Sequence, residues 1–132
     1  MSEGSEQALR RSIGIVFSDG GLLALSAVRP PGAGGHGEEQ VTAVLCDPDG
    51  APVEVSETLL STEYGPDGVQ RRATLELWTD GDDGQPLRGA GTLISAAARV
   101  RQAGSESDIA FFRWSVEGRE GLGHYEVVRG DG

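Results

Sequence analysis

The chain has 132 residues, the length of one ordinary domain, and is long enough to bury a hydrophobic core. Its 11 basic residues, all arginine, stand against 21 acidic residues, which gives a formal net charge of −10. A surface this acidic repels phosphate backbones and anionic lipid headgroups. We therefore expect neither nucleic acid nor a membrane as a partner.

The N-terminal segment "MSEGSEQALRRS" is polar and carries acidic residues before its arginines. It lacks the basic start and apolar middle of a secretion signal. Apolar runs such as Gly21–Leu25 are far shorter than the roughly 20 residues that a membrane helix needs. These features predict a cytoplasmic protein.

Apolar and polar residues alternate along the chain, and turn signals interrupt this alternation at 18–21, 47–50, 65–68 and 80–84. Asp-Gly between apolar runs is a strong hairpin signal, because a tight turn between antiparallel strands needs positive φ. We expect a flexible segment over 1–11, one domain over 12–129 and a tail over 130–132. About eight strands are predicted: Ser12–Ser18, Leu22–Arg29, Gln40–Asp47, Pro52–Tyr64, Val69–Thr79, Leu87–Gln102, Asp108–Glu117 and Leu122–Arg129.

The segment "VQRRATLELW" shows the alternation best, with one inward face predicted to hold Val69, Arg71, Ala73, Leu75 and Leu77. Short connections predict that each strand pairs with the one before it. Eight such strands lose their exposed edges by closing into a barrel. The sequence thus predicts an all-β, antiparallel, up-and-down β-barrel, with a two-sheet β-sandwich as the alternative. The segment 29–39 is expected to be a loop at the barrel mouth.

Motifs for cofactors are weak in this chain. "GAGGHG" (32–37) has the letters of a dinucleotide fingerprint, but prolines precede it and a strand, not a helix, is predicted to follow. The acidic run 80–84 does not match the spacing of a calcium loop and predicts a solvated hairpin tip. His36 and His124 have no second ligand at metal-binding spacing. We expect no metal and no cofactor.

Cys46 is the single cysteine, so an intramolecular disulfide is excluded. It lies at the end of the strand "QVTAVLC". A small buried apolar side chain is the common role of a cysteine in such a position, and a nucleophile is the rare one.

The last two strands carry the most informative side chains. In "IAFFRWSVEG", Phe112 and Trp114 share one face and Phe111 and Arg113 the other. If the Phe111 face pointed inward, Arg113 would be buried and would need a carboxylate such as that of Glu126 or Glu76. The favoured alternative places Phe112 and Trp114 in the core and Arg113 outside.

The C-terminal stretch "GREGLGHYEVVRG" places His124 and Glu126 on one face of its strand and Tyr125 on the other. Whether this face points into the barrel stays open. The glycines at 118, 121 and 123 predict a final hairpin and a bulge that bends the strand to close the barrel.

The segments "RRSIGIVFSDGGLLALSAVRP", "DPDGAPVEVSETLLSTEYGPDGVQRRATLELW" and "FFRWSVEGREGLGHYEVV" carry a family resemblance that covers most of 11–129. The chain resembles the carboxy-terminal half of the lipocalin-like double-barrel proteins related to carotenoid 1,2-hydratase (hydroxyneurosporene synthase) and the AttH-type proteins. That resemblance implies a lipocalin-like barrel and an apolar polyene or polyketide ligand, bound in or between two barrels. This chain has only one barrel, and no catalytic residue of the hydratase carries over.

Two functions follow as hypotheses. The first is a lipocalin-like barrel that binds a hydrophobic small molecule, either without catalysis or as a cofactor-free isomerase, cyclase or hydratase in bacterial secondary metabolism. His124 or Glu126 would move a proton, Arg113 would hold developing negative charge, and the apolar cavity would be shaped by Trp78, Phe111, Phe112, Trp114 and Tyr125.

The second hypothesis is a non-catalytic interaction module that forms a homodimer or docks on a partner protein. A cavity lined by Arg113, His124 or Glu126 favours the first hypothesis. A filled barrel with an apolar outer strip favours the second.

Overall fold

The computed structural model describes residues 8–30, 39–79 and 85–130, and only the backbone of 95–97. Three predicted features lie outside these ranges: the centre of the mouth loop with its glycine motif and His36, the acidic tip 80–84, and the first seven residues of the N-terminal segment.

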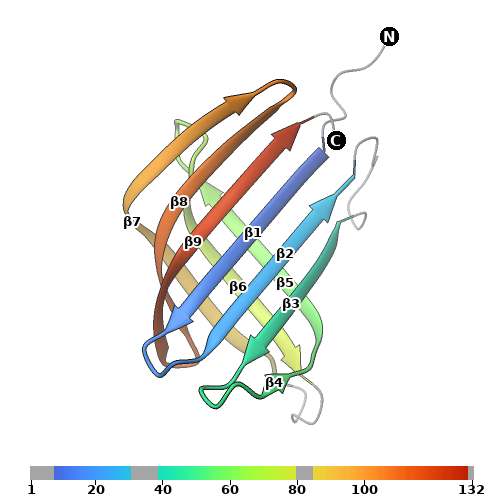
Figure 1. Cartoon of the computed structure of the whole chain (residues 1–132), viewed down its shortest axis with the longest axis vertical. Coiled ribbons are helices and arrows are strands. Elements are labelled where there is room, and N and C mark those ends of the chain that lie inside the picture. Colours follow the sequence, from blue (N-terminus) through green and yellow to red (C-terminus); the bar gives the residue numbers. More distant parts are fainter. Residues whose placement is uncertain (1–7, 31–38, 80–84, 131–132) are drawn as a thin grey trace.

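The described residues form an antiparallel, barrel-like sheet, which confirms the all-β, up-and-down barrel (Figure 1). The first strand begins at Ala8, four residues before the predicted start at Ser12. The strands are β1 (Ala8–Phe17), β2 (Leu22–Arg29), β3 (Gln40–Cys46), β4 (Pro52–Val53), β5 (Val55–Tyr64), β6 (Gln70–Thr79), β7 (Leu87–Gln102), β8 (Ser105–Val116) and β9 (Arg119–Gly130).

Pairing along the sheet follows the order β4-β3-β2-β1-β9-β8-β7-β6-β5, so the first and last strands are neighbours in the middle. The predicted strand 52–64 is divided at Glu54, because β4 pairs with β3 at one edge and β5 pairs with β6 at the other. The segments β3 and β5 lie side by side and bring the two edges together (Figure 1). The sheet therefore curves into a nearly closed barrel.

Alternation in the strands sends one face of each into the barrel. On β1, Ile13, Ile15 and Phe17 are buried, and the residues between them lie on the outside or are half-buried. The same pattern on the other strands completes a single core. Its further members include Leu23, Leu25, Leu45, Ala73, Leu75, Leu77, Ala110, Phe112, Trp114, Val116, Tyr125 and Val127.

The predicted inward face of β6 is right at one end of the strand and wrong at the other. Ala73, Leu75 and Leu77 are buried, whereas Arg71 is exposed and Gln70 is fully buried in its place. The register between β5 and β6 shifts at this point: Glu63 pairs with Arg72, but the next residue, Tyr64, pairs with Gln70. This irregularity changes which side chains turn inward at the start of β6.

The final hairpin is as predicted, but the bulge after it is not. Glu117 and Gly118 both have positive φ, as a tight two-residue turn requires. Pairing of β9 with β8 and with β1 runs without a shift over the described register, so no bulge occurs at Gly121 or Gly123. The irregularities lie instead in the β5–β6 pair and in β7, between Leu93 and residue 97.

Candidate functional site

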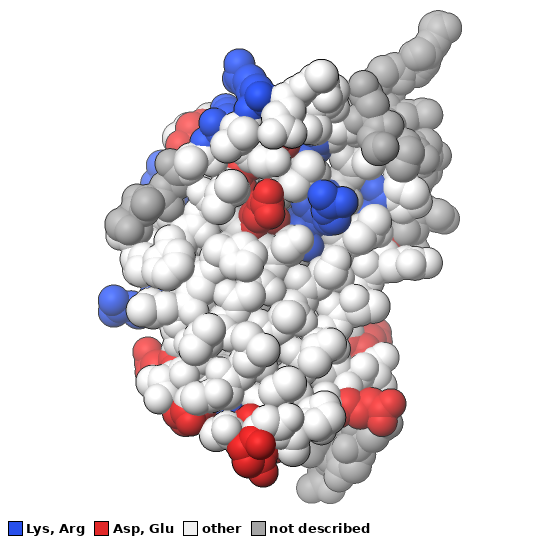
Figure 2. All heavy atoms as spheres, viewed as in Figure 1, with Lys and Arg blue, Asp and Glu red and all other residues white. Residues whose placement is uncertain are grey.

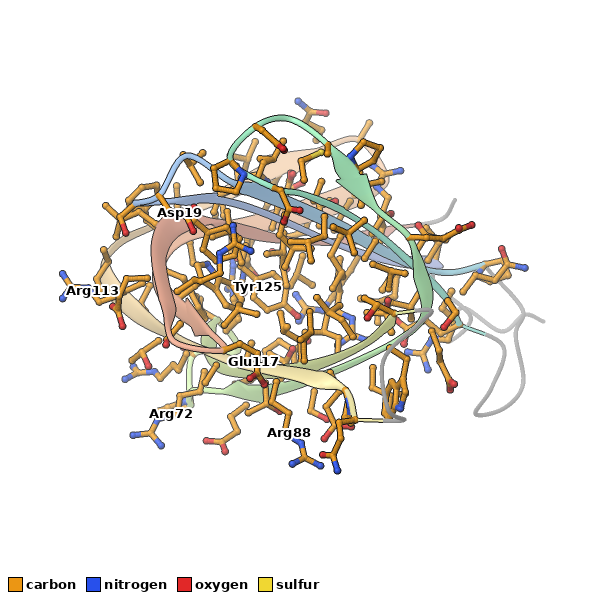
Figure 3. All side chains as sticks on the ribbon, turned by 90° about the horizontal axis from the view of Figure 1, so that it is seen from below. Asp19, Arg72, Arg88, Arg113, Glu117 and Tyr125 are labelled. Carbon is orange, nitrogen blue, oxygen red and sulfur yellow. The ribbon has the colours of Figure 1, made fainter. Side chains whose placement is uncertain are left out.

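The structure answers which face of the last two strands points inward. Phe112, Trp114 and Tyr125 are fully buried, and Figure 3 shows Tyr125 inside the barrel and Arg113 pointing away from it. The other predicted site residues on β8 and β9, Phe111, His124 and Glu126, lie on the outer side. Trp78 on β6 follows the inward Leu77 and is half-buried.

The three inward aromatic rings form one cluster. Phe112 stacks on Trp114 with ring centroids 5.2 Å apart, and Tyr125 meets Phe112 edge-on at 5.6 Å. Trp114 also packs so closely on Gly91 of β7 that a β-carbon there would overlap its ring. These rings are therefore part of the packed core.

A polar network occupies one end of the barrel interior. The Arg11 guanidinium, almost wholly buried, donates to both carboxylate oxygens of Glu39 at 2.7 and 2.8 Å and to the Thr62 hydroxyl at 3.3 Å. A further hydrogen bond joins the hydroxyls of Thr62 and Tyr125. Burial disfavours the Arg11 charge, but attraction to Tyr125 and Glu39 outweighs burial and raises the pKa of the guanidinium.

The polar network continues from Tyr125 to Gln70 and Asp108. The Gln70 amide nitrogen donates to the backbone oxygens of Asp108 at 2.9 Å and Tyr125 at 2.7 Å. Asp108 in turn accepts hydrogen bonds from Arg99 at 2.7 Å and Arg129 at 3.1 Å. Burial opposes ionisation of Asp108, but these two guanidinium groups hold the pKa of its carboxyl below the usual value.

Arg11, Gln70 and Asp108 are interior residues that were not predicted from the sequence. Asp108 alternates with the buried Ala110 and Phe112 on β8, and this alternation is the sequence signal for an inward side chain. Arg11 alternates in the same way with Ile13 and Ile15. This network ties β1, β5, β6, β8 and β9 together, which gives it a clear structural role.

The three predicted catalytic residues are not joined into a working cluster. Among the described residues, no hydrogen bond or ion pair links Arg113, His124 and Glu126 to one another or to a third group. The His124 ring lies over Gly14 of β1, with its Cε1 2.8 Å from the place of a Gly14 β-carbon. A proton relay built from these residues would therefore lie on the outer side of the barrel and not in its interior.

The outer side of these strands has a different character. We call the outward face of β8, β9, β1, β2 and β3 the front wall, and Figure 1 shows these strands in front of β5 and β6. Figure 2 shows a broad area without charged residues on this wall, with charged groups above and below it. Its exposed apolar side chains are Val16, Leu22, Val28, Val44, Ile109, Phe111 and Leu122.

Strand register arranges these side chains in rows across the wall. Leu122 of β9, Val16 of β1 and Leu22 of β2 are direct neighbours, and we call this row the ridge. The next row holds Gly14 and Ala24; the His124 ring covers Gly14, and we call the strip of low relief that remains at Ala24 the furrow. The furrow lies between His124 on β9 and Val44 on β3, and Arg113 and Cys46 continue the ridge on β8 and β3.

A groove opens at the lower end of the front wall. It has a volume of about 490 Å³ and its lining is mainly apolar, with Arg113 on one side. Three other depressions lie over β5–β6–β7 or β7–β8–β9. The lining residues of the front-wall groove are Val16, Phe17, Ser18, Arg113, Glu120, Gly121 and Leu122.

We also searched the described residues for a metal site and for a membrane-spanning helix. No three His, Cys, Asp or Glu side chains there are placed to hold a metal ion. Among the described residues, no helix is long and apolar enough to cross a membrane. Cys46 is a free, half-buried thiol on the front wall.

The chain matches no protein-family model and no curated protein sequence.

Proposed function

We propose that this chain is a non-catalytic interaction module, a β-barrel that docks on another protein surface through its front wall. The observation that carries the proposal is an apolar, largely uncharged wall on a molecule of net charge −10. Glu126 lies on this wall, but the row of Leu122, Val16 and Leu22 carries three adjacent exposed apolar side chains. Contiguous exposed apolar surface rimmed by polar residues is typical of protein interfaces.

The packing of the interior supports the same function. Phe112, Trp114 and Tyr125 contact one another, and the polar groups at the end of the barrel bond mainly to one another. The predicted proton-transfer residues His124 and Glu126 lie on the front wall, where an interface would use them as contact residues.

The family resemblance fits this proposal. In the double-barrel proteins that the chain resembles, two barrels provide a pocket in or between them. A single barrel of this kind would place its docking wall against a second barrel.

Native mass spectrometry of the protein isolated from its own host tests the docking function. We expect a protein complex that is lost in the Val16→Glu variant, because Val16 is 63% exposed and stands in the middle of the ridge, between Leu122 and Leu22. A matched control is Leu59→Glu, an exposed position on β5 outside the wall. A chain that carries no protein partner, or a complex that survives Val16→Glu, would contradict the proposal.

A second candidate function is binding of a small amphipathic anion, and the groove of about 490 Å³ favours it. Apolar side chains of Val16, Phe17 and Leu122 would hold the hydrocarbon part, and Arg113 would pair with a carboxylate. The same mass spectrum tests it, because a retained small molecule adds mass to the single chain. Loss of this mass in Arg113→Ala, with retention in Leu59→Glu, would favour the second candidate over the first.

A further inference from the structure

We infer that the ion pair between Arg11 and Glu39 is a latch, which holds the barrel closed where β3 and β5 face each other without strand pairing. Release of this latch opens the barrel locally, while the rest of the sheet stays paired. The inference goes beyond the proposed docking function and does not depend on it.

We call the gap between the facing edges of β3 and β5 the seam. Among the described residues, no strand pairing crosses the seam, because the pairing order ends at β4 on one side and at β5 on the other. The lower end of the seam is tied, since β4 pairs with Leu45 and Cys46 and only Glu54 separates β4 from β5. Figure 1 shows β3 and β5 diverging from that end towards the opposite, upper end. The upper part of the seam, beside residues 40–44, therefore depends on side-chain contacts.

Arg11 points inward from β1 and contacts both sides of the upper seam. Its guanidinium donates to both carboxylate oxygens of Glu39, the residue before β3, at 2.7 and 2.8 Å. The same guanidinium donates to the Thr62 hydroxyl on β5 at 3.3 Å. Paired hydrogen bonds between a guanidinium and a carboxylate are strong and fix the geometry of both groups. One side chain thus joins the two strands that no backbone pairing joins.

The interior beside the seam is less buried than the rest of the core. Val41 and Ala43 of β3 and Leu60 and Thr62 of β5 point inward but are only half-buried. By contrast, Phe112 on β8 is fully buried. Local opening of a fold begins where few side chains are buried. The seam is therefore the part of the described barrel that we expect to open first.

The latch also supplies a force for opening once it is broken. The Arg11 side chain is only 10% exposed, and its Nε has no hydrogen-bond partner among the described residues. The buried Oε1 of Gln70, in the same polar network, also has none. A buried charge that loses its carboxylate is costly until water reaches it. Without the Glu39 carboxylate, an open seam that hydrates Arg11 is favoured over a closed one.

Thiol labelling in a Cys46→Ser background measures opening at the seam. Ala43→Cys places a thiol on the inward face of β3, and Ala110→Cys places one in the core on β8. We expect Glu39→Gln to raise the rate of labelling by a bulky maleimide at position 43 about tenfold or more, the effect of losing a charged hydrogen bond. The rate at position 110 should stay unchanged. Unchanged labelling at position 43 would overturn the latch, and an equal rise at both positions would show global unfolding and overturn a local opening.

A matched control removes a carboxylate from another ion pair. Glu106→Gln breaks the pair with Arg101 on the far side of the barrel sheet, and labelling at position 43 should not respond. A rise as large as that in Glu39→Gln would overturn the specific role of Glu39.

Hydrogen exchange followed by mass spectrometry checks the latch without added cysteines. We expect Glu39→Gln to speed exchange of the amides of 40–46 on the edge strand β3, and to leave those of 108–116 on β8 unchanged. Equal acceleration of both segments, or none in 40–46, would overturn the latch.

Discussion

Gly123 on β9 lies so close to Gly14 on β1 that a β-carbon on Gly123 would overlap the carbonyl oxygen of Gly14. The contact is with backbone, which cannot move aside without breaking the β1–β9 pairing. The first strand, β1, and the last strand, β9, can approach this closely only because Gly123 has no side chain.

This contact predicts unequal effects of two alanine substitutions. Gly123→Ala should cost several kcal/mol, because overlap with backbone forces the strands apart. Gly14→Ala is the control: its β-carbon would meet only the His124 ring, at 2.8 Å from Cε1, and this side chain can rotate away. Thermal unfolding followed by circular dichroism measures both, and equal losses of stability would contradict the account.

The buried carboxylate of Asp108 predicts a pH-dependent loss of stability. Replacement Asp108→Asn should lower the free energy of unfolding by about 1–3 kcal/mol at pH 7, because Arg99 and Arg129 would lose their charged partner while keeping partial access to water. The arginine hydrogen bonds outweigh burial and lower the pKa of Asp108 below 3.8, so its stabilising effect is present above that pH and is lost as the pH falls through the lowered pKa. Urea unfolding of both proteins between pH 7 and pH 3 measures this. A stability difference that disappears well above pH 4 would contradict it.

We expect ionisation of the Tyr125 hydroxyl to lower the stability of the fold at high pH. Burial raises the pKa of its hydroxyl above 10.0, and the bonds to Thr62 and Arg11 offset only part of that effect. Because the neutral phenol is favoured in the fold, stability should fall as the pH rises above 10. Ultraviolet titration of Tyr64→Phe, which leaves Tyr125 as the single tyrosine, should give a midpoint above 10. A midpoint at or below 10 would show that the hydroxyl is not buried in this network.

We expect loss of the His124 side chain to weaken association while leaving the stability of the fold almost unchanged. This side chain lies outside the core, so His124→Ala should change the free energy of unfolding by no more than about 0.5 kcal/mol. The ring lies on the front wall, one row above Leu122, so its removal should weaken association with a partner docked there. Urea unfolding and sedimentation equilibrium measure the two quantities. Unchanged association would remove His124 from the interface.

Much of the fold could be predicted because its signals are local. Alternation and Asp-Gly turns lie within single strands and hairpins, and they identified the strands and the favoured inward face of Phe112 and Trp114. The burial of Gln70 depends on how β5 pairs with β6, and the division at Glu54 depends on which sheet edge each half joins. Neither is visible within one strand.

The candidate site was harder to predict for the same reason. The sequence showed that His124 and Glu126 share a face, but the direction of that face depends on which side of β9 meets the core. The partners of Arg11 and Asp108 come from distant positions, such as Thr62, 51 residues along the chain from Arg11. The ridge and furrow arise only when β9, β1 and β2 are aligned.

The most direct test of the front wall as the functional surface is hydroxyl-radical footprinting of the purified chain alone and of the complex isolated from its host. We expect Phe111 and Leu122 to be oxidised several-fold less in the complex, and Leu59 and Tyr64 on β5 to react equally in both samples. Equal oxidation of Phe111 and Leu122 in both samples would contradict the front wall as the docking surface.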